Sequence, residues 1–364
     1  MKILIGADLV PTDQTEALFV AGDEKTLFGG VAPMMKNADR VLINLECALT
    51  ESTNAIKKFG PNLKAKPACA DTLKAVGVTD VALSNNHVFD FGVEGLQDTL
   101  KHLDRVGLPY MGVGENDTLS RKPYFIEQDG VTVGIINVCE HEYTYALPDR
   151  MGANPFDPYL TMQDIMAVRS QADYVIVLYH GGKEHCRYPS PRLRKLCQAM
   201  VDFGADFVIT QHSHCIGCYE KYKGGQIVYG QGNFHFCKNG MRDGWYTSLL
   251  LELEIKGKSA SETTLSFYPI VSKEDGIDLA DEKTREDVLN GFYARSAELE
   301  NGKWLDGWHE FCLSAKDFYN RVISECTTES TEKQKQFFAH YLDCEAHTDV
   351  WKELYPTWNS TNEK

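Results

Sequence analysis

The sequence predicts an α/β protein in which a layered sheet domain is followed by a helical extension. Over roughly the first 270 residues, short β-rich runs alternate with helical patterns, and several runs, including 174–179, are apolar on both faces. Strands that are covered on both sides have this composition. After about residue 280 no β-rich run remains, and the periodicity is helical. We therefore expect an α/β domain over residues 1–275 and a C-terminal helical appendage over residues 281–364.

The individual elements follow from hydrophobic patterning and from its interruption by turn-forming residues. The runs expected to be buried strands are 2–7, 40–45, 80–83, 132–138, 173–179, 206–210 and 226–229. The helical patterns between them occupy 92–106, 162–171 and 191–203. The runs 247–255 and 263–270 alternate more clearly, which is typical of a closing antiparallel pair. In the appendage, helices are expected over 283–300, 304–325 and 331–345.

The composition excludes several classes of protein. The chain has 364 residues, a net charge of −15 at pH 7 and a hydrophobic share of 43%, which rules out general disorder. The acidic balance argues against non-specific binding to nucleic acid, which rewards clustered Lys and Arg. No apolar run approaches the ~18 residues of a membrane span, so no membrane insertion is expected. The 11 cysteines are irregularly spaced and favour reduced thiols, and the chain starts without a secretory pattern, so we expect a cytoplasmic protein.

Residues that bind metals recur where the expected strands end. Asp8 ends the first strand and Glu46 follows the second. Later strands end in Ser-Asn-Asn-His at 84–87, in His180, in Gln-His-Ser-His at 211–214 and in Gly-Gln-Gly-Asn-Phe-His at 230–235. In open α/β sheets, ligands collect outside the carboxyl ends of the strands. Carboxylate, amide oxygen and imidazole together suit Mn, Fe or Zn better than Mg or Ca.

Each of these residues taken alone also has a structural explanation. A single strand-end histidine is commonly just hydrogen-bonded, Asn-Asn-His suits a turn, and Asp8 could cap the turn that follows it. Chance explains the set poorly, because one strand end after another supplies a metal-ligand type. The combination therefore favours a metal site over isolated structural residues.

A longer series of motifs runs through the same region in a specific order. It consists of Gly6-Ala7-Asp8, Asn44-Leu45-Glu46, Lys58-Phe59, Asn85-Asn86-His87, Asp90-Phe91-Gly92, Gly95-Leu96, Gly112-Val113-Gly114 with Asn116, His180-Gly181-Gly182-Lys183-Glu184, His212-Ser213-His214 and Gly232-Asn233-Phe234. This series resembles the poly-γ-glutamate capsule biosynthesis protein family (CapA/PgsA type), within the calcineurin-like metallophosphoesterase superfamily. The resemblance covers roughly residues 1–270 and leaves the helical appendage outside it.

The resemblance implies a four-layered α/β/β/α sandwich with a dinuclear site for divalent transition metal ions. The resemblance implies that Glu46 bridges the two metals. It implies that Asp8 and His214 bind the first metal, and that Asn86, His180 and His212 bind the second. His87 stands where the superfamily keeps a histidine that protonates the leaving group or stabilises charge at phosphorus. Two cations ~3.5–4 Å apart clamp the attacking and leaving oxygens and promote hydroxide formation near neutrality.

The sequence departs from the superfamily pattern at the first metal. The superfamily usually begins Asp-x-His, whereas here the stretch is Asp8-Leu9-Val10, and the bridging Asp is replaced by the longer Glu46. One ligand is therefore missing, and the first metal should bind more weakly. The substitutes considered are Glu140, His141, Glu184 and His235. Glu184 is preferred and joins His87 as a catalytic candidate, because it shares a strand-end loop with His180; its alternative role is to orient a ligating histidine.

Three basic residues are candidates for binding an anionic substrate. Lys58 and Lys64 lie in the loop after Glu46, and Arg187 follows His180. For the lysines, a solvated loop is the equal alternative. At least one of these cations could hold a carboxylate or phosphate in an otherwise acidic protein.

The motifs and the resemblance together point to a metal-dependent, phosphoesterase-like hydrolase. Its natural reaction is hydrolysis of a phosphoester or phosphoanhydride during synthesis of capsule, whether poly-γ-glutamate or polysaccharide. The alternative is a non-catalytic accessory or scaffold protein of cell-envelope polymer synthesis that keeps a degenerate metal site. The implied partners are an anionic small-molecule or polymer substrate, a polymer synthase and, through the C-terminal helices, a second copy of the chain.

Overall fold

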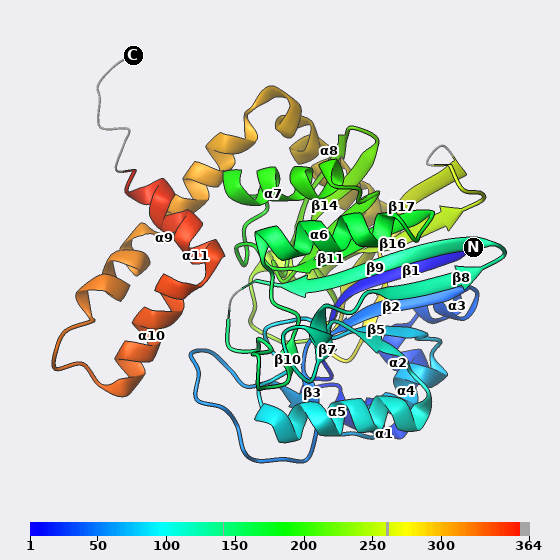
Figure 1. Cartoon of the computed structure of the whole chain (residues 1–364), viewed down its shortest axis with the longest axis horizontal. Helices are drawn as coiled ribbons and strands as arrows, with labels where there is room; N and C mark the ends of the chain where they lie inside the picture. Colours follow the sequence, from blue (N-terminus) through cyan, green and yellow to red (C-terminus); the bar gives the residue numbers. More distant parts are fainter. Residues whose placement is uncertain (141, 260–261, 357–364) are drawn as a thin grey trace.

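The computed structural model describes residues 1–140, 142–259 and 262–356 (Figure 1). Two β-sheets are stacked face to face, helices cover both outer faces, and further helices extend from one end of this body. The predicted α/β/β/α sandwich with a C-terminal helical extension is confirmed.

The first sheet has eight strands in the order β18-β17-β16-β1-β2-β5-β6, and β15 pairs with β1 off this path. Its centre is parallel: Ile3 of β1 lies opposite Arg40 of β2, and Leu42 lies opposite Asp80 of β5. The neighbours β16 and β17 are antiparallel, as expected. The strands are β1 (Lys2–Leu9), β2 (Arg40–Leu45), β5 (Asp80–Ala82), β6 (Tyr110–Met111), β15 (Asn233–His235), β16 (Thr247–Ile255), β17 (Thr263–Ser272) and β18 (Ile277–Leu279).

The second sheet has six strands in the order β13-β14-β12-β11-β9-β8. The four inner strands are parallel, and the edge strands β8 and β13 are antiparallel to their neighbours. The strands are β8 (Tyr124–Gln128), β9 (Val131–Cys139), β11 (Tyr174–His180), β12 (Phe207–Gln211), β13 (Ile216–Tyr222) and β14 (Gly225–Gln231). Because the inner strands are parallel, their carboxyl ends lie side by side, with His180 opposite Gln211.

Side chains alternate between two cores along the central strands. Ile3 and Ile5 of β1 face the second sheet, where they share a core with Ile176 and Leu178 of β11. Leu4, between them, faces the opposite way and joins the core under the outer helices. Each central strand is therefore buried on both faces, which explains why the sequence shows continuous apolar runs there.

Helices cover each outer face of the sandwich. The first sheet is covered by α1 (Glu16–Ala21), α2 (Glu24–Phe28), α3 (Val31–Lys36), α4 (Cys69–Ala75) and α5 (Gly92–Val106). The second is covered by α6 (Pro158–Arg169) and α7 (Pro191–Asp202). Both of these begin with a side-chain cap followed by proline: Asp157 and Ser190 accept backbone N–H bonds from the first turn. Two short strand pairs complete the body: β3 (Ala48–Leu49) with β4 (Lys64–Ala65), and β7 (Val113–Gly114) with β10 (Gly152–Ala153).

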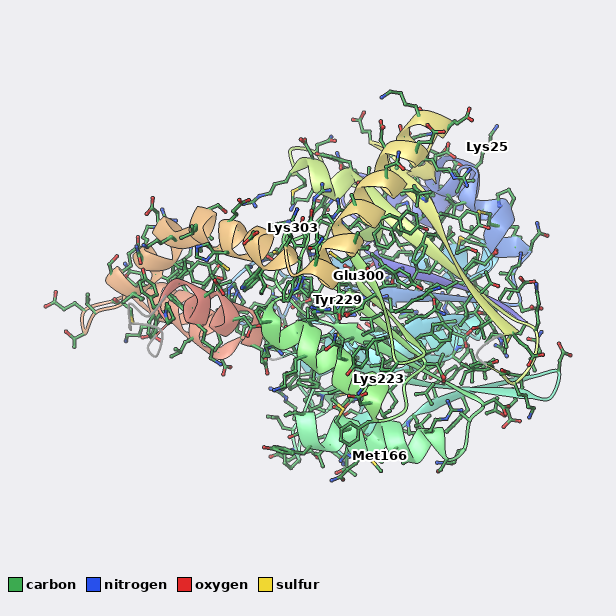
Figure 2. All side chains as sticks on the ribbon, turned by 90° about the horizontal axis from the view of Figure 1, so that it is seen from above. Lys25, Met166, Lys223, Tyr229, Glu300 and Lys303 are labelled. Carbon is green, nitrogen blue, oxygen red and sulfur yellow. The ribbon has the colours of Figure 1, made fainter. Side chains whose placement is uncertain are left out.

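The C-terminal helices pack on the body at one end. Helix α8 (Glu282–Asn301) lies along β13 and β17, where the Phe292 ring is 5.0 Å from that of Phe267. The chain then turns into α9 (Trp304–Ser324), and Figure 2 shows Glu300 and Lys303 at this turn, beyond which the helices project sideways. The last two helices are α10 (Glu332–Asp343) and α11 (Glu345–Leu354). Together α9–α11 share a core with Cys186 of the body.

Several elements were not expected from the sequence, among them the edge strands β8 and β13 of the second sheet and the short helices α1–α4. The helices α1–α4 have five to seven residues each, too few for a helical period to repeat clearly. The expected helix over 331–345 corresponds to α10, which ends at Asp343, whereas α11, which follows Cys344, was not foreseen. None of the helices in the described part of the chain combines the length and the apolar character that crossing a membrane requires.

Candidate metal centre

The predicted ligands come from strand ends of both sheets. Asp8 sits near the end of β1, fully buried, and its Oδ1 accepts a hydrogen bond from Asn44 Nδ2 at 2.8 Å. His180 is the last residue of β11. His212 and His214 follow β12 in left-handed backbone, with φ of 85° and 52°. Such conformations cost about 1–3 kcal/mol each and concentrate at functional sites.

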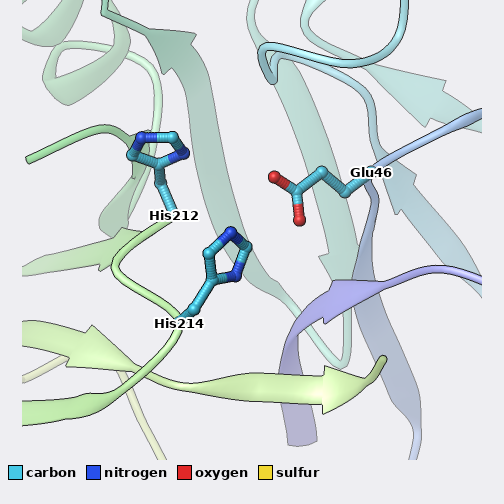
Figure 3. A group of neighbouring side chains, drawn as sticks. All are labelled: Glu46, His212 and His214. Carbon is cyan, nitrogen blue, oxygen red and sulfur yellow. The ribbon is translucent and has the colours of Figure 1, made fainter. Parts of the chain in front are cut away.

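Glu46 is the centre of the group. It is buried, and neither carboxylate oxygen has a hydrogen-bond partner among the described residues. Figure 3 shows its carboxylate facing the imidazoles of His212 and His214, and one ligand atom from each of the three lies within 4.8 Å of the others. His180 Nε2 is 3.3 Å from Glu46 Oε1. Burying a carboxylate without a donor costs several kcal/mol, and a cation at this point would satisfy it.

The second half of the predicted ligand set converges on the same place. His180 Nε2 lies 2.9 Å from Asn86 Oδ1, and the His180 and His212 rings are 4.8 Å apart. His180 is oriented through its other nitrogen, because Asn44 Nδ2 lies 3.1 Å from Nδ1. Asn86 is oriented by Glu142, whose Oε2 accepts from its Nδ2 at 3.1 Å. The predicted residues are therefore brought together with their ligand atoms inward.

The two predicted ligands of the first metal, Asp8 and His214, lie next to each other. His214 Nδ1 lies 3.5 Å from Asp8 Oδ2 and 2.8 Å from Asn233 Oδ1. The backbone N–H of His212 also donates to Asp8 Oδ2, at 3.2 Å. Asn233 pairs with Asp8 in the register of β15 on β1, and its Nδ2 has no partner among the described residues.

Burial disfavours the charged form of every titratable side chain in this group, and the neighbours of each side chain determine whether it is charged at neutral pH. Burial and the adjacent Asp8 raise the pKa of Glu46 to about 8. Burial lowers the pKa of His180 to about 4 and that of His212 to about 3. Burial is outweighed at the other two residues. Hydrogen bonding to His214 and the charge of His180 lower the pKa of Asp8 to about 2, and the charge of Glu46 together with Asp8 raises the pKa of His214 to about 10. His180 and His212 are thus neutral, the form in which imidazole binds a metal.

His87 is positioned differently from the ligands. Its Nδ1 lies 2.6 Å from Asp90 Oδ2 and 3.1 Å from Lys58 Nζ, and Lys58 also pairs with Asp90 Oδ1. The Lys58 side chain is only 2% exposed. Asp90 therefore fixes the ring through Nδ1 and leaves Nε2 as the nitrogen available to a substrate.

A cavity of about 180 Å³ opens beside this group. Its walls come from three parts of the chain: the loop 58–61, the strand-end segments of the body, and the last two helices. The lining residues are Lys58, Phe59, Gly60, Pro61, Asn86, His87, Glu142, Gly182, Lys183, Glu184, His212, His340, Tyr341, Cys344, Ala346 and His347. Glu184, the preferred substitute ligand, is among them, and nearby cationic groups, Lys183 first, lower its pKa despite burial.

Two predicted substrate-binding residues do not line this cavity. Lys64 Nζ donates to the Ser52 carbonyl at 2.6 Å and lies over the Phe91 ring, beside a separate hollow. Arg187 is exposed, and its carbonyl accepts from Cys218 Sγ. Contact of either residue with a substrate stays a prediction.

The side chains of two other substitutes for the missing ligand make contacts outside the group. The Glu140 carboxylate is occupied by Arg192, by the Tyr179 hydroxyl at 2.7 Å and by the Gly182 N–H at 2.7 Å. His235 is buried between Phe19 and Phe28, with ring centroids 5.0 and 5.1 Å away, and burial lowers its pKa to about 4. His141 lies outside the described residues.

Sequence reasoning missed several residues that shape the site. Glu142 follows a predicted strand closely enough to have been considered, and burial raises its pKa to about 8. Lys183 belongs to the motif His180-Gly181-Gly182-Lys183-Glu184, but the sequence pattern alone assigns it no function. His340 and His347 lie on helices far along the chain, and only the folded structure brings them to the cavity.

Comparison with known proteins places the chain in a family. The model of the family described as bacterial capsule synthesis protein PGA_cap matches residues 2–238, and the chain belongs to this family. The resemblance derived from the motifs is thereby confirmed. Helices α8–α11 lie beyond the matched residues.

Similar proteins include two from Bacillus. The capsule biosynthesis protein CapA of Bacillus anthracis is 33% identical over 219 residues, which is 58% of this chain and 53% of that protein. The PGA biosynthesis protein CapA of Bacillus subtilis is 31% identical over 218 residues, 58% of this chain and 57% of that protein. The chain thus spans about half the length of these relatives. A solved structure titled as a novel phosphatase from Mycoplasma pneumoniae aligns with 78% of this chain and 95% of its own, at 15% identity and a TM-score of 0.46.

Proposed function

We propose that the protein is a metal-dependent phosphoesterase-like hydrolase of the capsule-synthesis family. The observation that carries the proposal is the buried Glu46 carboxylate, which lacks a hydrogen-bond partner among the described residues and faces His180, His212 and His214. Carboxylate, amide and imidazole donors fit Mn, Fe or Zn. Glu46 would bridge two ions; the first would also use Asp8 and His214, and the second Asn86, His180 and His212.

The bound ions would polarise a phosphoryl oxygen and lower the pKa of a water molecule. The chain's own residues do the rest. His87, held through Nδ1 by Asp90 at 2.6 Å, gives a proton from Nε2 to the leaving oxygen as the bond between that oxygen and phosphorus breaks. Lys58, paired with Asp90, keeps the Asp90 charge balanced. Glu184 faces the cavity as an oriented carboxylate that holds a ligating histidine or a water.

We place this activity in the synthesis of poly-γ-glutamate or another capsule polymer, in the cytoplasm and beside a polymer synthase. Family membership supports the polymer, and the acidic surface supports a small-molecule or polymer substrate that is recognised locally rather than by long-range attraction.

A second function, that of a non-catalytic accessory protein, is favoured by one observation. The residues after Asp8 are Leu9 and Val10, which are 0% and 2% exposed and belong to the apolar core. The first metal therefore lacks the histidine that the superfamily places there. A degenerate site that binds one ion would suit a scaffold.

One experiment separates these functions. Protein purified without chelator is analysed for metal, reloaded with Mn, Fe or Zn, and tested against a panel of phosphomonoesters, diesters and anhydrides. Two ions per chain with turnover that His87→Ala abolishes supports the hydrolase. One ion per chain without turnover on any substrate supports the accessory protein, and failure to bind any of the three metals refutes both functions.

A further inference from the structure

The cavity beside the candidate metal ligands has two walls of different origin. One wall is made by strand-end segments of the body, including Asn86, Glu184 and His212. The other is made by α10 and α11, through His340, Tyr341, Cys344, Ala346 and His347. The family match ends at residue 238, so the second wall lies outside the part of the chain that defines the family.

The second wall is held in place by specific contacts. His340 stacks on Tyr143, with ring centroids 5.9 Å apart and an interplanar angle of 12°, and lies 5.2 Å from Phe59. The Tyr319 hydroxyl is 2.6 Å from His347 Nδ1, while His347 Nε2 is 3.2 Å from His340 Nε2. These bonds orient the two imidazoles.

The position of α11 on the body is also fixed. Asp349 Oδ2 accepts from Ser190 Oγ at 2.6 Å and from Arg192 Nε at 2.9 Å. Asp349 is 7% exposed, so this charge-assisted pair is largely shielded from water. Helix α11 is therefore docked where α7 begins, and the wall it forms is part of the folded body.

Lys183 is the cation of the cavity that lacks a partner. Lys58 also lines the cavity, but its charge is neutralised by Asp90. The Lys183 side chain is half-buried and forms no ion pair or hydrogen bond with another described residue. A partly desolvated ammonium without a partner gains most from an anionic group on a ligand, because such charge-assisted hydrogen bonds are the strong ones.

The size of the cavity limits what it accepts. A volume of about 180 Å³ corresponds to about six water molecules at about 30 Å³ each. That space suits a small organic group attached to a phosphoryl group.

We propose that Lys183 and the wall formed by α10 and α11 are a subsite for the organic part of a small phosphomonoester that carries a second anionic group. Lys183 binds this second group, a carboxylate in the simplest case, and His340 limits the size of the carbon skeleton. The proposal rests on the proposed function, because it places the phosphoryl group at the metal ligands.

The test uses two non-hydrolysable phosphonates of equal length, propylphosphonate and 3-phosphonopropionate, titrated calorimetrically into the Mn-loaded full chain. We expect the carboxylate-bearing analogue to bind at least tenfold more tightly than propylphosphonate, as one charge-assisted contact provides. In Lys183→Gln the two affinities become equal while Mn content is unchanged. Lys303→Gln, an exposed lysine at the start of α9, is the matched control and keeps the preference.

A second variant tests the wall. His340→Ala enlarges the cavity, so benzylphosphonate should gain at least fivefold in affinity relative to 3-phosphonopropionate. Equal affinities of the first two analogues in the wild type, a preference that survives Lys183→Gln, or an unchanged benzylphosphonate ratio would each overturn the subsite. If the analogues bind with the expected preference but no phosphoester is hydrolysed, the hydrolase proposal fails and the subsite stands. If phosphoesters are hydrolysed without the preference, the subsite alone fails.

Discussion

Replacing Glu46 with glutamine should abolish metal binding and at the same time stabilise the metal-free protein. Burial and the adjacent Asp8 raise the pKa of Glu46 from 4.5 to about 8. Glutamine has the shape of the protonated carboxyl but never ionises. The substitution therefore removes the cost of keeping this group protonated at neutral pH, while it removes the anionic ligand that a bridged metal pair needs.

The magnitude and its pH dependence follow from linkage. In the unfolded chain Glu46 ionises above pH 4.5, whereas in the folded chain it stays protonated up to about pH 8. Folding is therefore penalised progressively between these two values and by a constant amount above them. At 1.36 kcal/mol per pH unit, the penalty is below about 1 kcal/mol at pH 5 and about 3 kcal/mol at pH 7. The advantage of Glu46→Gln should grow accordingly.

The assay is urea unfolding of wild type and variant in EDTA at pH 5, 7 and 8, followed by the same series with Mn. Glu274→Gln, at an exposed site, is the control and should change neither series. With Mn the wild type should gain stability by mass action, and Glu46→Gln should gain none. A variant that binds as much Mn as wild type, or whose advantage does not increase between pH 5 and 7, would refute the reasoning.

Three further substitutions test neighbouring parts of the site. His87→Ala should retain metal by elemental analysis but lower kcat by ~10²–10⁴; loss of metal would make His87 a ligand instead. Lys58→Ala leaves the buried Asp90 charge unpaired and should lower the free energy of unfolding, measured in urea, by about 3–5 kcal/mol. Lys64→Ala should not lower it, and an equal decrease in both variants would contradict a stabilising Lys58–Asp90 ion pair. Asp349→Asn weakens the docking of α11, so trypsin should release the C-terminal helices sooner than in wild type; unchanged cleavage would count against that contact.

The strands and the strand-end positions of the candidate ligands could be predicted from the sequence because both depend on local patterns. Continuous apolar runs identify strands buried on both faces, and Ile3 with Leu4 shows the reason, since they face different cores. Parallel strands then bring their carboxyl ends to one edge. Residues as distant as Asp8 and His214 meet there, 3.5 Å apart.

The roles of the basic residues could not be predicted in the same way. Lys58 and Lys64 belong to the same segment after Glu46, yet Lys58 enters a buried ion pair with Asp90 and Lys64 bonds the Ser52 carbonyl. That difference depends on how the loop crosses the body. The same holds for His340 and His347, which reach the cavity only because α9–α11 fold back onto Cys186 and Phe59.

If the site holds two metal ions as proposed, the structure gives a reason for the two positions to differ. The second position has its predicted ligands Asn86, His180 and His212 in contact, and each is oriented by a further residue or by the backbone. The first relies on Asp8 and His214, because Val10, the residue that a histidine would replace, is packed in the apolar core. In the proposed site the carboxylate of Glu46 would serve both positions, so the weaker position would depend most on it. Metal stoichiometry therefore reports on the first position, while the presence of any metal reports on Glu46.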